Sequence, residues 1–169
     1  MRGRPAASMP NVKPVVIGLI ADTHGLVRPG VHTALAGVSL ILHAGDVGGD
    51  DVLDELALIA PVEAVFGNMD SDDDPRLARE VIRDVNGVRI HVSHGHELGQ
   101  PRPDALAARY EGRVLVYGHT HRALITRLDA RLVVNPGAAG PRRFNLEPSV
   151  ARLTIDQRGV HVAIVPLDA

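Results

Sequence analysis

Aspartate, asparagine and histidine side chains follow five short hydrophobic runs of this 169-residue sequence, each at the point where the run ends. Asp22 and His24 follow the first run, Asp46 the second and Asn68 the third. Histidine pairs follow the last two runs, and they are His94 with His96 and His119 with His121. Imidazole nitrogens and carboxylate or amide oxygens are donors that divalent metals take in proteins. Their recurrence at one kind of position predicts a metal site.

The five runs have the features of buried strands. They cover residues 15–21, 40–44, 62–66, 88–93 and 114–117. Each is short, contains β-branched residues and is followed by glycine or polar residues, which is typical of a strand that ends in a loop. Helical patterns at 31–36 and 50–60 separate the first three runs, so right-handed crossovers and parallel strands are expected. The ends of such strands can meet at one edge of a sheet, where open α/β folds build their sites.

The second half of the chain predicts more strand than helix. Residues 80–85 and 88–93 have the pattern of a hairpin, because Asn86-Gly87 between them tolerates the positive φ of a tight turn. A helix is expected at 103–110. Further strands are expected at 113–117, 123–128, 131–135, 150–155 and 160–165. The pattern favours an α/β fold in which two mixed sheets pack together and helices flank them, an α-β-β-α sandwich.

Composition limits the class of protein. The length suits a single domain, expected over residues 15–169, behind a flexible N-terminal tail over residues 1–14. A formal charge of −2 and an aromatic content of 2% disfavour a long nucleic acid as a ligand, although a nucleotide in a pocket is compatible with both. No apolar run approaches the roughly 18 residues of a membrane-spanning helix, so the expected location is the cytoplasm, with no membrane partner. The oligomeric state is left open, a homo-oligomer included.

The donor inventory is large for a single ion. The chain has no cysteine, so a metal must take nitrogen and oxygen ligands. The candidate ligands comprise two Asp, one Asn and four His, and they are Asp22, His24, Asp46, Asn68, His94, His119 and His121. One catalytic ion usually takes three or four protein ligands, so this set fits two divalent ions that share a carboxylate.

At these residues the sequence resembles the calcineurin-like metallophosphoesterases. Their ordered signature is D-x-H, GD, GN, a histidine in a GH-type block, and GH-x-H. The resemblance extends from about Val15 to the end of the chain, and it is strongest to the small bacterial and archaeal phosphodiesterases. The last motif of those enzymes, NPG, is present as Asn135-Pro136-Gly137. The same small branch includes the eukaryotic retromer subunit Vps29, which shares the fold and works as a protein scaffold.

The resemblance implies how the ligands are divided between two ions. One ion would be bound by Asp22, His24, Asp46 and His121. The second would be bound by Asp46, Asn68, His94 and His119, with Asp46 as the bridge. Between two such ions a bridging hydroxide becomes the nucleophile that attacks a phosphoric ester. Manganese is the expected metal, and iron, nickel, cobalt and zinc are alternatives. Asp46, Asn68 and His96 are the expected catalytic residues.

One position departs from the pattern of many phosphoesterases in this superfamily. The residue after the Asn of the GN motif is often a His that protonates the leaving oxygen, and here it is Met69. Because general acid catalysis contributes about 10²–10⁴-fold, its loss favours substrates with good leaving groups. We therefore expect a small phosphodiester as substrate, a nucleotide among the candidates, and better rates on aryl or cyclic diesters than on alkyl monoesters. The alternatives are a non-catalytic protein scaffold and a phosphomonoesterase or phosphatase with the same site.

Residues near the motifs have expected supporting roles. Asp70 is expected to orient Asn68 or His94, although it can also serve as a turn residue. His43 lies inside a strand just before Asp46, so it is expected to be buried packing or a support for the ligands. Arg142 and Arg143 follow the NPG turn, where they could bind a phosphate, with plain surface charge as the alternative. His96 either lines the substrate pocket or lies in an exposed loop.

Overall fold

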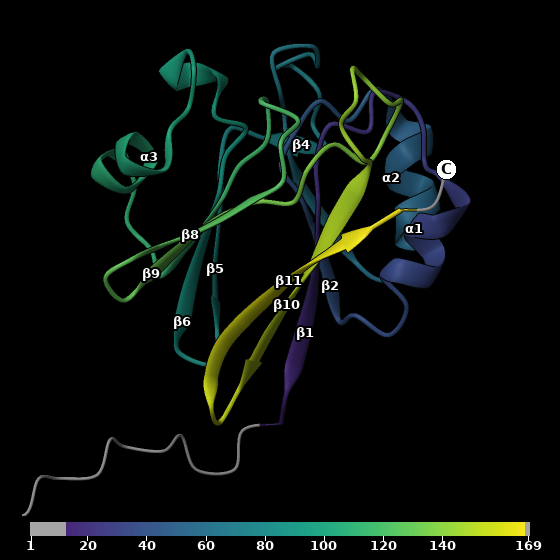
Figure 1. Cartoon of the computed structure of the whole chain (residues 1–169). Coiled ribbons are helices and arrows are strands. Elements are labelled where there is room, and N and C mark those ends of the chain that lie inside the picture. Colours follow the sequence, from purple (N-terminus) through teal and green to yellow (C-terminus); the bar gives the residue numbers. More distant parts are fainter. Residues whose placement is uncertain (1–12, 168–169) are drawn as a thin grey trace, which may run out of the picture.

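Two β-sheets pack face to face, and helices cover their outer sides (Figure 1). The computed structural model describes residues 13–167. In the first half the elements are β1 Val15–Ile20, α1 Pro29–Ala34, β2 Leu40–His43, α2 Asp50–Ala57, β3 Val62–Val65, β4 Leu77–Ala78, β5 Val81–Val85 and β6 Val88–Val92. In the second half they are the 3₁₀ helix η1 His96–Leu98, α3 Pro103–Arg109, β7 Val114–Val116, β8 Leu124–Leu128, β9 Arg131–Asn135, β10 Ser149–Asp156 and β11 Gly159–Pro166.

Both sheets mix parallel and antiparallel strands. The first has the strand order β11-β10-β1-β2-β3-β4, in which β1 to β4 are parallel, β10 runs antiparallel to β1, and β11 runs antiparallel to β10. The second has the order β5-β6-β7-β9-β8, in which β6, β7 and β9 are parallel and the two edge strands are antiparallel. The strands that carry the candidate ligands therefore run parallel within each sheet, and their carboxyl ends lie at one edge of it.

Alternating side chains explain why these strands are apolar on both faces. Ile17 and Leu19 of β1 belong to the core between the two sheets, whereas Ile20 packs toward α1 and α2. In the second sheet Val114 and Val116 of β7 face the inner core, while Leu115 packs with the residues that lie under α3. A strand buried on both sides reads as a continuous hydrophobic run, which is the pattern that the sequence carries.

The predicted two-sheet sandwich with mixed sheets is confirmed. The first three strands are parallel as expected, and the hairpin between β5 and β6 turns at Asn86 and Gly87, whose φ values are 49° and 78°. The helix expected at 31–36 begins earlier, at Pro29, because proline fits the first turn of a helix. The helix expected at 50–60 ends at Ala57, three residues early. The sequence did not predict β4 or η1, which are too short to carry a periodic signal.

Two further sequence expectations concern the N-terminal tail and membrane-spanning helices. The tail expected over residues 1–14 lies outside the described residues except for Lys13 and Pro14. Among the described helices, none is both long and apolar enough to span a bilayer.

Candidate metal centre

The seven candidate ligands all lie in loops directly after β1, β2, β3, β6 and β7. Asp22 and His24 follow β1, Asp46 follows β2 and Asn68 follows β3. His94, His119 and His121 follow β6 and β7 of the second sheet. The two sheets pack with these strand ends on the same side, so the loops of both sheets contribute to one cluster of side chains.

The backbone at this edge adopts conformations that ordinary residues avoid. Five of the seven candidate ligands have a positive φ, and they are Asp22 (54°), His24 (45°), Asp46 (55°), His119 (71°) and His121 (62°). A left-handed backbone costs a non-glycine residue free energy, and such residues cluster at functional sites. Here the left-handed backbone directs the side chains of several loops toward one another.

Glycines allow the loops to approach closely. A Cβ atom at Gly67 would lie 2.1 Å from Asp46 Oδ1, and one at Gly45 would lie 2.6 Å from His94 Nδ1. Neither neighbour can move, because both belong to the cluster itself. The glycines of the GD and GN motifs are therefore needed for space.

One half of the cluster comprises Asp22, His24 and His121. The Nε2 atoms of His24 and His121 are 3.3 Å apart, and His121 Nε2 lies 3.6 Å from Asp22 Oδ1. One ligand atom from each of the three residues lies within 4.8 Å of the others. Asp22 is fully buried, and His24 and His121 are partly exposed. The three donors can face a single cation.

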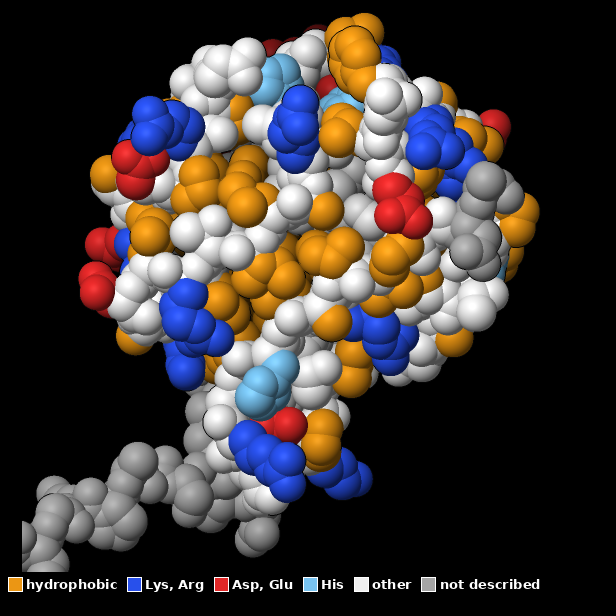
Figure 2. All heavy atoms as spheres, in the orientation of Figure 1, with side chains coloured by type: hydrophobic (Ala, Val, Ile, Leu, Met, Phe, Trp, Pro, Cys, Tyr) orange, Lys and Arg blue, Asp and Glu red, His pale blue; other side chains and the backbone are white. Residues whose placement is uncertain are grey.

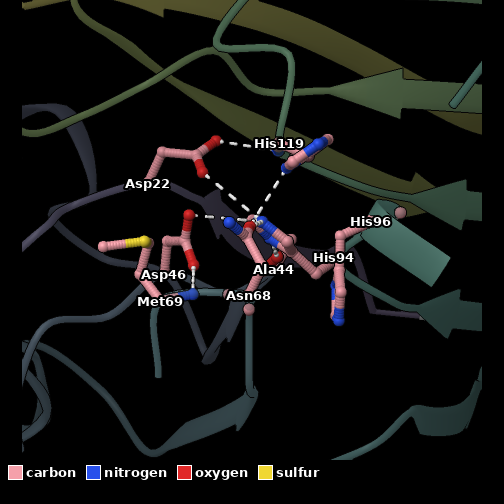
Figure 3. A network of polar contacts seen from close by, with 12 residues as sticks. Asp22, Ala44, Asp46, Asn68, Met69, His94, His96 and His119 are labelled. Atoms are coloured by element: carbon pink, nitrogen blue, oxygen red, sulfur yellow. Dashed lines mark hydrogen bonds and ion pairs between the residues drawn. The ribbon is translucent and has the colours of Figure 1, made fainter. Parts of the chain in front are cut away.

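The other half is built around the buried His94 (Figure 3). His94 donates its Nδ1–H to the backbone oxygen of Ala44 at 2.7 Å, which leaves Nε2 facing the cluster. Asn68 Oδ1 lies 3.0 Å from His94 Nε2 and 3.1 Å from His119 Nδ1. Ligating histidines almost always donate their second N–H to a backbone or carboxylate oxygen, which fixes the ring. His94 already has that support.

Asp46 lies between the two halves. Its Oδ2 atom is 3.7 Å from His24 Nε2 and 3.4 Å from His94 Nε2, while Oδ1 accepts the backbone N–H of Met69 at 2.9 Å. One carboxylate oxygen thus faces a histidine of each half. Asp22 also reaches both, since it forms a second group of close donors with Asp46 and His94.

Burial and mutual charge shift the pKa values of these groups. Burial raises the pKa of Asp22 to about 7, with the nearby charge of Asp46 adding to the rise and His94 opposing it. Burial also acts to raise the pKa of Asp46, but its hydrogen bond and attraction to His94 outweigh it and bring the pKa to about 2. Burial lowers the pKa of His121 to about 4, and the positive charges of His24 and Arg143 lower it further. The carboxylates of Asp22 and Asp46 therefore favour a positive charge close to them.

This donor set fits divalent metal ions. Asp22 Oδ1 is buried and has no hydrogen-bond partner among the described residues. Oxygen and nitrogen atoms that can ligate a metal converge from separate loops at about hydrogen-bond distance, an arrangement that positive charge between them stabilises. A proton on His94 can supply part of that charge, and divalent cations can supply all of it.

Comparison with known proteins identifies the family. A model of the calcineurin-like phosphoesterase superfamily domain matches residues 15–158, which include all seven candidate ligands. The chain belongs to this superfamily. A probable metallophosphoesterase of Methanothermobacter thermautotrophicus is 36% identical over 161 residues, which cover 89% of this chain and 92% of that protein. A phosphodiesterase of Methanocaldococcus jannaschii is 27% identical over 141 residues, covering 72% and 82% of the two chains.

The fold of this calcineurin-like phosphoesterase is also that of a protein-sorting subunit. Vacuolar Protein Sorting 29 from Cryptosporidium parvum superposes with a TM-score of 0.76 and 21% identity, covering 92% of this chain and 99% of that one. The family and its named relatives identify the chain as a metal-dependent phosphoester hydrolase. The predicted resemblance is thereby confirmed, including its structural relation to the sorting subunit.

His43 holds two of the ligand loops together. It is fully buried, and its Nδ1 atom accepts the backbone N–H of Gly45 at 3.1 Å. Its Nε2–H therefore donates to Thr23 Oγ1 at 2.9 Å, and the Thr23 hydroxyl donates to the backbone oxygen of Val47 at 2.8 Å. Burial lowers the pKa of His43 to about 3, so the ring stays neutral. The sequence analysis missed Thr23, whose position between Asp22 and His24 was the available signal.

Asp70 supports the site in a different way from the one expected. Its carboxylate accepts three backbone N–H groups, from Gly67 at 2.9 Å, Val47 at 3.0 Å and Gly48 at 3.1 Å. These bonds join the loop after β2 to the loop after β3. The expected contact with the side chain of Asn68 or His94 is not among them, because the carboxylate turns toward loop backbone. Asp70 thus positions Asn68 through the main chain at Gly67.

The two arginines after the NPG turn are not equivalent. Both are exposed and line a small groove beside His121. The charge of Arg143 is among the main causes that lower the pKa values of Asp22, His24 and His121. Arg143 is therefore the better placed of the pair to meet an anionic ligand at the metal centre.

His96 and Met69 lie on opposite sides of the cluster's rim. The ring of His96 is 5.3 Å from that of His94 and 6.4 Å from that of His119, measured between centroids, and it lines a cavity. Met69 is 70% exposed and contributes only its backbone N–H.

Asn135 of the NPG motif connects the turn to the last histidine loop. Its amide Nδ2 donates to the backbone oxygen of Gly118 at 3.2 Å and to Thr120 Oγ1 at 3.0 Å, and its Oδ1 accepts the N–H of Gly137. The motif is a rigid turn beside the metal-facing edge, and it also braces the loop that carries His119 and His121.

Proposed function

We propose that this protein is a dinuclear phosphodiesterase that hydrolyses small phosphodiesters. The observation that carries the proposal is the position of Asp46 Oδ2, within 4 Å of a histidine in each half of the cluster. One ion would be held by Asp22, His24, Asp46 and His121, and the other by Asp46, Asn68, His94 and His119. Manganese is the proposed metal. A single domain over residues 15–169 would carry the whole site.

Two bound divalent ions would act as Lewis acids, activating water near neutral pH and offsetting the charge of the phosphate. The chain's own residues would do the rest. Asp46 and Asn68 would hold their positions in the site through the backbone bonds that Asp70 and Met69 make around them. Arg143 would attract the anionic substrate to the side of His24 and His121.

His96 is the proposed proton donor to the leaving oxygen. It is the histidine on the rim that no ligand assignment uses, and its Nδ1 atom is buried with no hydrogen-bond partner among the described residues. Its ring faces the cavity beside the centre rather than the backbone. It would assist the departure of the alcohol less directly than a residue at position 69, so good leaving groups are favoured.

The test is a comparison of substrates at a known metal content. Purified protein loaded with Mn²⁺ should contain about two ions per chain. It should hydrolyse bis(p-nitrophenyl) phosphate, lose that activity in a chelator and regain it with Mn²⁺. Its rate on a simple alkyl phosphomonoester should be lower by about 10²-fold or more, since general acid catalysis matters most for poor leaving groups. Equal rates on the two esters would instead indicate a phosphomonoesterase, and a single ion would end the dinuclear proposal.

A second candidate function is a protein-interaction scaffold. The observation that favours it is the apolar surface over β8, β10 and β11, where orange side chains gather in Figure 2. Leu124 and Ile125 are 41% and 39% exposed there, and a groove of about 420 Å³ runs from Leu124 to Ile164. The structural likeness to Vacuolar Protein Sorting 29 is compatible with such a role. Absence of both metal binding and diester hydrolysis would favour this candidate.

A further inference from the structure

A cavity of about 250 Å³ lies beside the metal centre, since His96 lines it and the ring of His96 is 5.3 Å from that of His94. His96 and Phe66 form its wall toward the centre, and their rings lie 6.4 Å apart. Phe66 directly precedes the GN motif, so this wall is continuous with the loop that carries Asn68. Any group in the cavity therefore lies next to a phosphate held at the metal centre.

The far wall is an aromatic surface that is held rigidly. Tyr110, at the end of α3, stacks on the ring of His91 with centroids 4.1 Å apart and planes 21° from parallel. Its hydroxyl donates to Glu97 Oε1 at 2.6 Å, and burial together with that bond raises the pKa of Tyr110 to about 12. The hydroxyl thus stays a donor, and the ring cannot easily rotate away.

The two carboxylates of the cavity are already engaged. Glu97 accepts the Tyr110 hydroxyl on one oxygen and the backbone N–H of Gly95 on the other, at 3.0 Å. Glu80 Oε2 lies 2.8 Å from His91 Nε2. Both groups keep lone pairs for further hydrogen bonds, because a carboxylate offers about four acceptor positions.

The two arginines of the cavity, by contrast, have no acidic partner among the residues that the structure describes. Within residues 13–167, neither Arg79 nor Arg109 forms an ion pair, although both line the cavity. The guanidinium of Arg109 lies over the ring of Tyr110, 5.5 Å from its centroid. The cavity therefore combines two aromatic rings, free guanidinium donors and carboxylate acceptors.

We infer that this cavity, the Phe66 pocket, binds the planar base of a nucleotide diester whose phosphate lies at the metal centre. This inference deepens the proposed diesterase function and rests on it for the position of the phosphate. Proteins hold unstacked bases by stacking them on aromatic or guanidinium planes and by bonding their edges. Arginine recognises acceptor edges such as guanine O6 and N7, and carboxylates accept from base amino groups.

The size of the pocket agrees with a single base. About 250 Å³ has room for roughly eight water molecules at about 30 Å³ each. A single ring system fits that space, and a second nucleotide does not. A base with both donor and acceptor edges, such as guanine, uses the arginines and the carboxylates together, so it should bind best.

The test measures binding rather than catalysis, so its outcome is separate from that of the proposed function. The Mn²⁺-loaded protein is titrated with guanosine 5′-monophosphate and with ribose 5-phosphate, which share the phosphate and the sugar and differ only in the base. We expect the nucleotide to bind about ten-fold more tightly, the order that one base–aromatic stack contributes. Phe66→Ala and Arg79→Ala should each remove most of that difference and leave the affinity for ribose 5-phosphate unchanged.

Arg102→Ala is the matched control, since Arg102 lies at the start of α3 with its side chain 78% exposed and does not line the pocket. It removes the same charge and should keep the preference for the nucleotide. Arg79 is exposed, so its replacement tests the pocket even if Phe66→Ala impairs folding. Equal affinity for the two ligands, or a preference for the nucleotide that survives in both variants, would overturn the inference.

If the protein proves not to hydrolyse diesters, a base preference that depends on Phe66 and Arg79 would still support the pocket. If it does hydrolyse them, the same two variants should raise KM for a guanosine-containing diester several-fold with kcat retained. A matched diester in which a methyl group replaces the guanosine has no base, and its KM should be the same in both variants as in the unaltered protein. A fall in kcat at unchanged KM would show that the residues act on chemistry instead, and would also overturn the inference.

Discussion

The two halves of the metal centre differ in how firmly the protein holds them. His94 is buried, its ring is oriented by the Ala44 carbonyl, and its Nε2 atom already meets Asn68. His24 and His121 are partly exposed, and in the described part of the chain their only side-chain hydrogen bond is to each other. The half around His94 is therefore preorganised, while the half around His24 depends on a cation to hold it together. Preorganisation lowers the cost of binding, so the two ions of the proposed dinuclear site should bind with unequal affinity.

The largest expected effect tests whether the two halves share a ligand. Asp46→Asn removes the charge that faces both His24 and His94. Metal content should fall for both ions, and diester hydrolysis should drop on the order of a thousandfold, because the lost charge stabilisation amounts to several kcal/mol. Metal analysis and steady-state rates measure both. Asp72→Asn, an exposed acid in the following loop, is the matched control and should behave as the unaltered protein does.

Two outcomes distinguish the possible bridges. Asp22 also reaches both groups of donors, so it is the alternative shared ligand. If Asp46→Asn loses only one ion and Asp22→Asn loses both, then Asp22 and not Asp46 is the shared ligand.

A smaller effect separates the halves from each other. His94→Gln should weaken the tighter of the two ions, whereas His24→Gln should weaken only the looser one. The tight ion should bind at least about a hundredfold more weakly in His94→Gln, because losing only the support of a metal ligand costs about ten- to a hundredfold and here the ligand itself is lost. Stepwise titration of the metal-free protein with Mn²⁺ resolves the two affinities. His161→Gln, whose side chain is 55% exposed, serves as the control. Equal losses in the two ligand variants would contradict unequal preorganisation.

The smallest expected effect is on the pH dependence of folding stability, and it comes from His43, which holds the loops of Asp22 and Asp46 together. Burial lowers the pKa of His43 to about 3 from its ordinary value of 6.5. Below pH 6.5 the unfolded chain binds a proton at this residue that the folded protein does not, so stability falls as the pH falls from 6.5 toward 3. His43 can contribute at most about 1.4 kcal/mol per pH unit to that slope.

Chemical denaturation of the metal-free protein between pH 7 and pH 4.5 measures this contribution. His43→Gln should unfold more easily at pH 7, because it disturbs the bonds to Thr23 and Gly45. It should also lose stability less steeply as the pH falls, since one titrating group is gone. His161→Gln should keep the slope of the unaltered protein. A slope that His43→Gln does not change would show that the ring is protonated in the folded state.

Much of this protein could be predicted from its sequence, and particular residues show why. Asp22, Asp46 and Asn68 directly follow strands, so their place at the sheet edge depended only on recognising those strands. The β-branched runs at β1 and β7 predicted buried strands, and the many strands of the second half predicted a second sheet packed on the first. The ends of α1 and α2 were less accurate, because helix termini depend on local packing that periodicity does not contain.

Local pattern alone determined which donors this chain has and that they stand at strand ends, since strand periodicity and sequence order are properties of neighbouring residues. Only the tertiary structure decided that Asp70 binds backbone rather than the Asn68 side chain, that the charge of Arg143 reaches the cluster, and that Phe66 and Tyr110 line one cavity. Those relations join residues of different loops and, for the most part, of distant parts of the chain. Their geometry is set by packing and electrostatics across the two sheets, which no local pattern encodes.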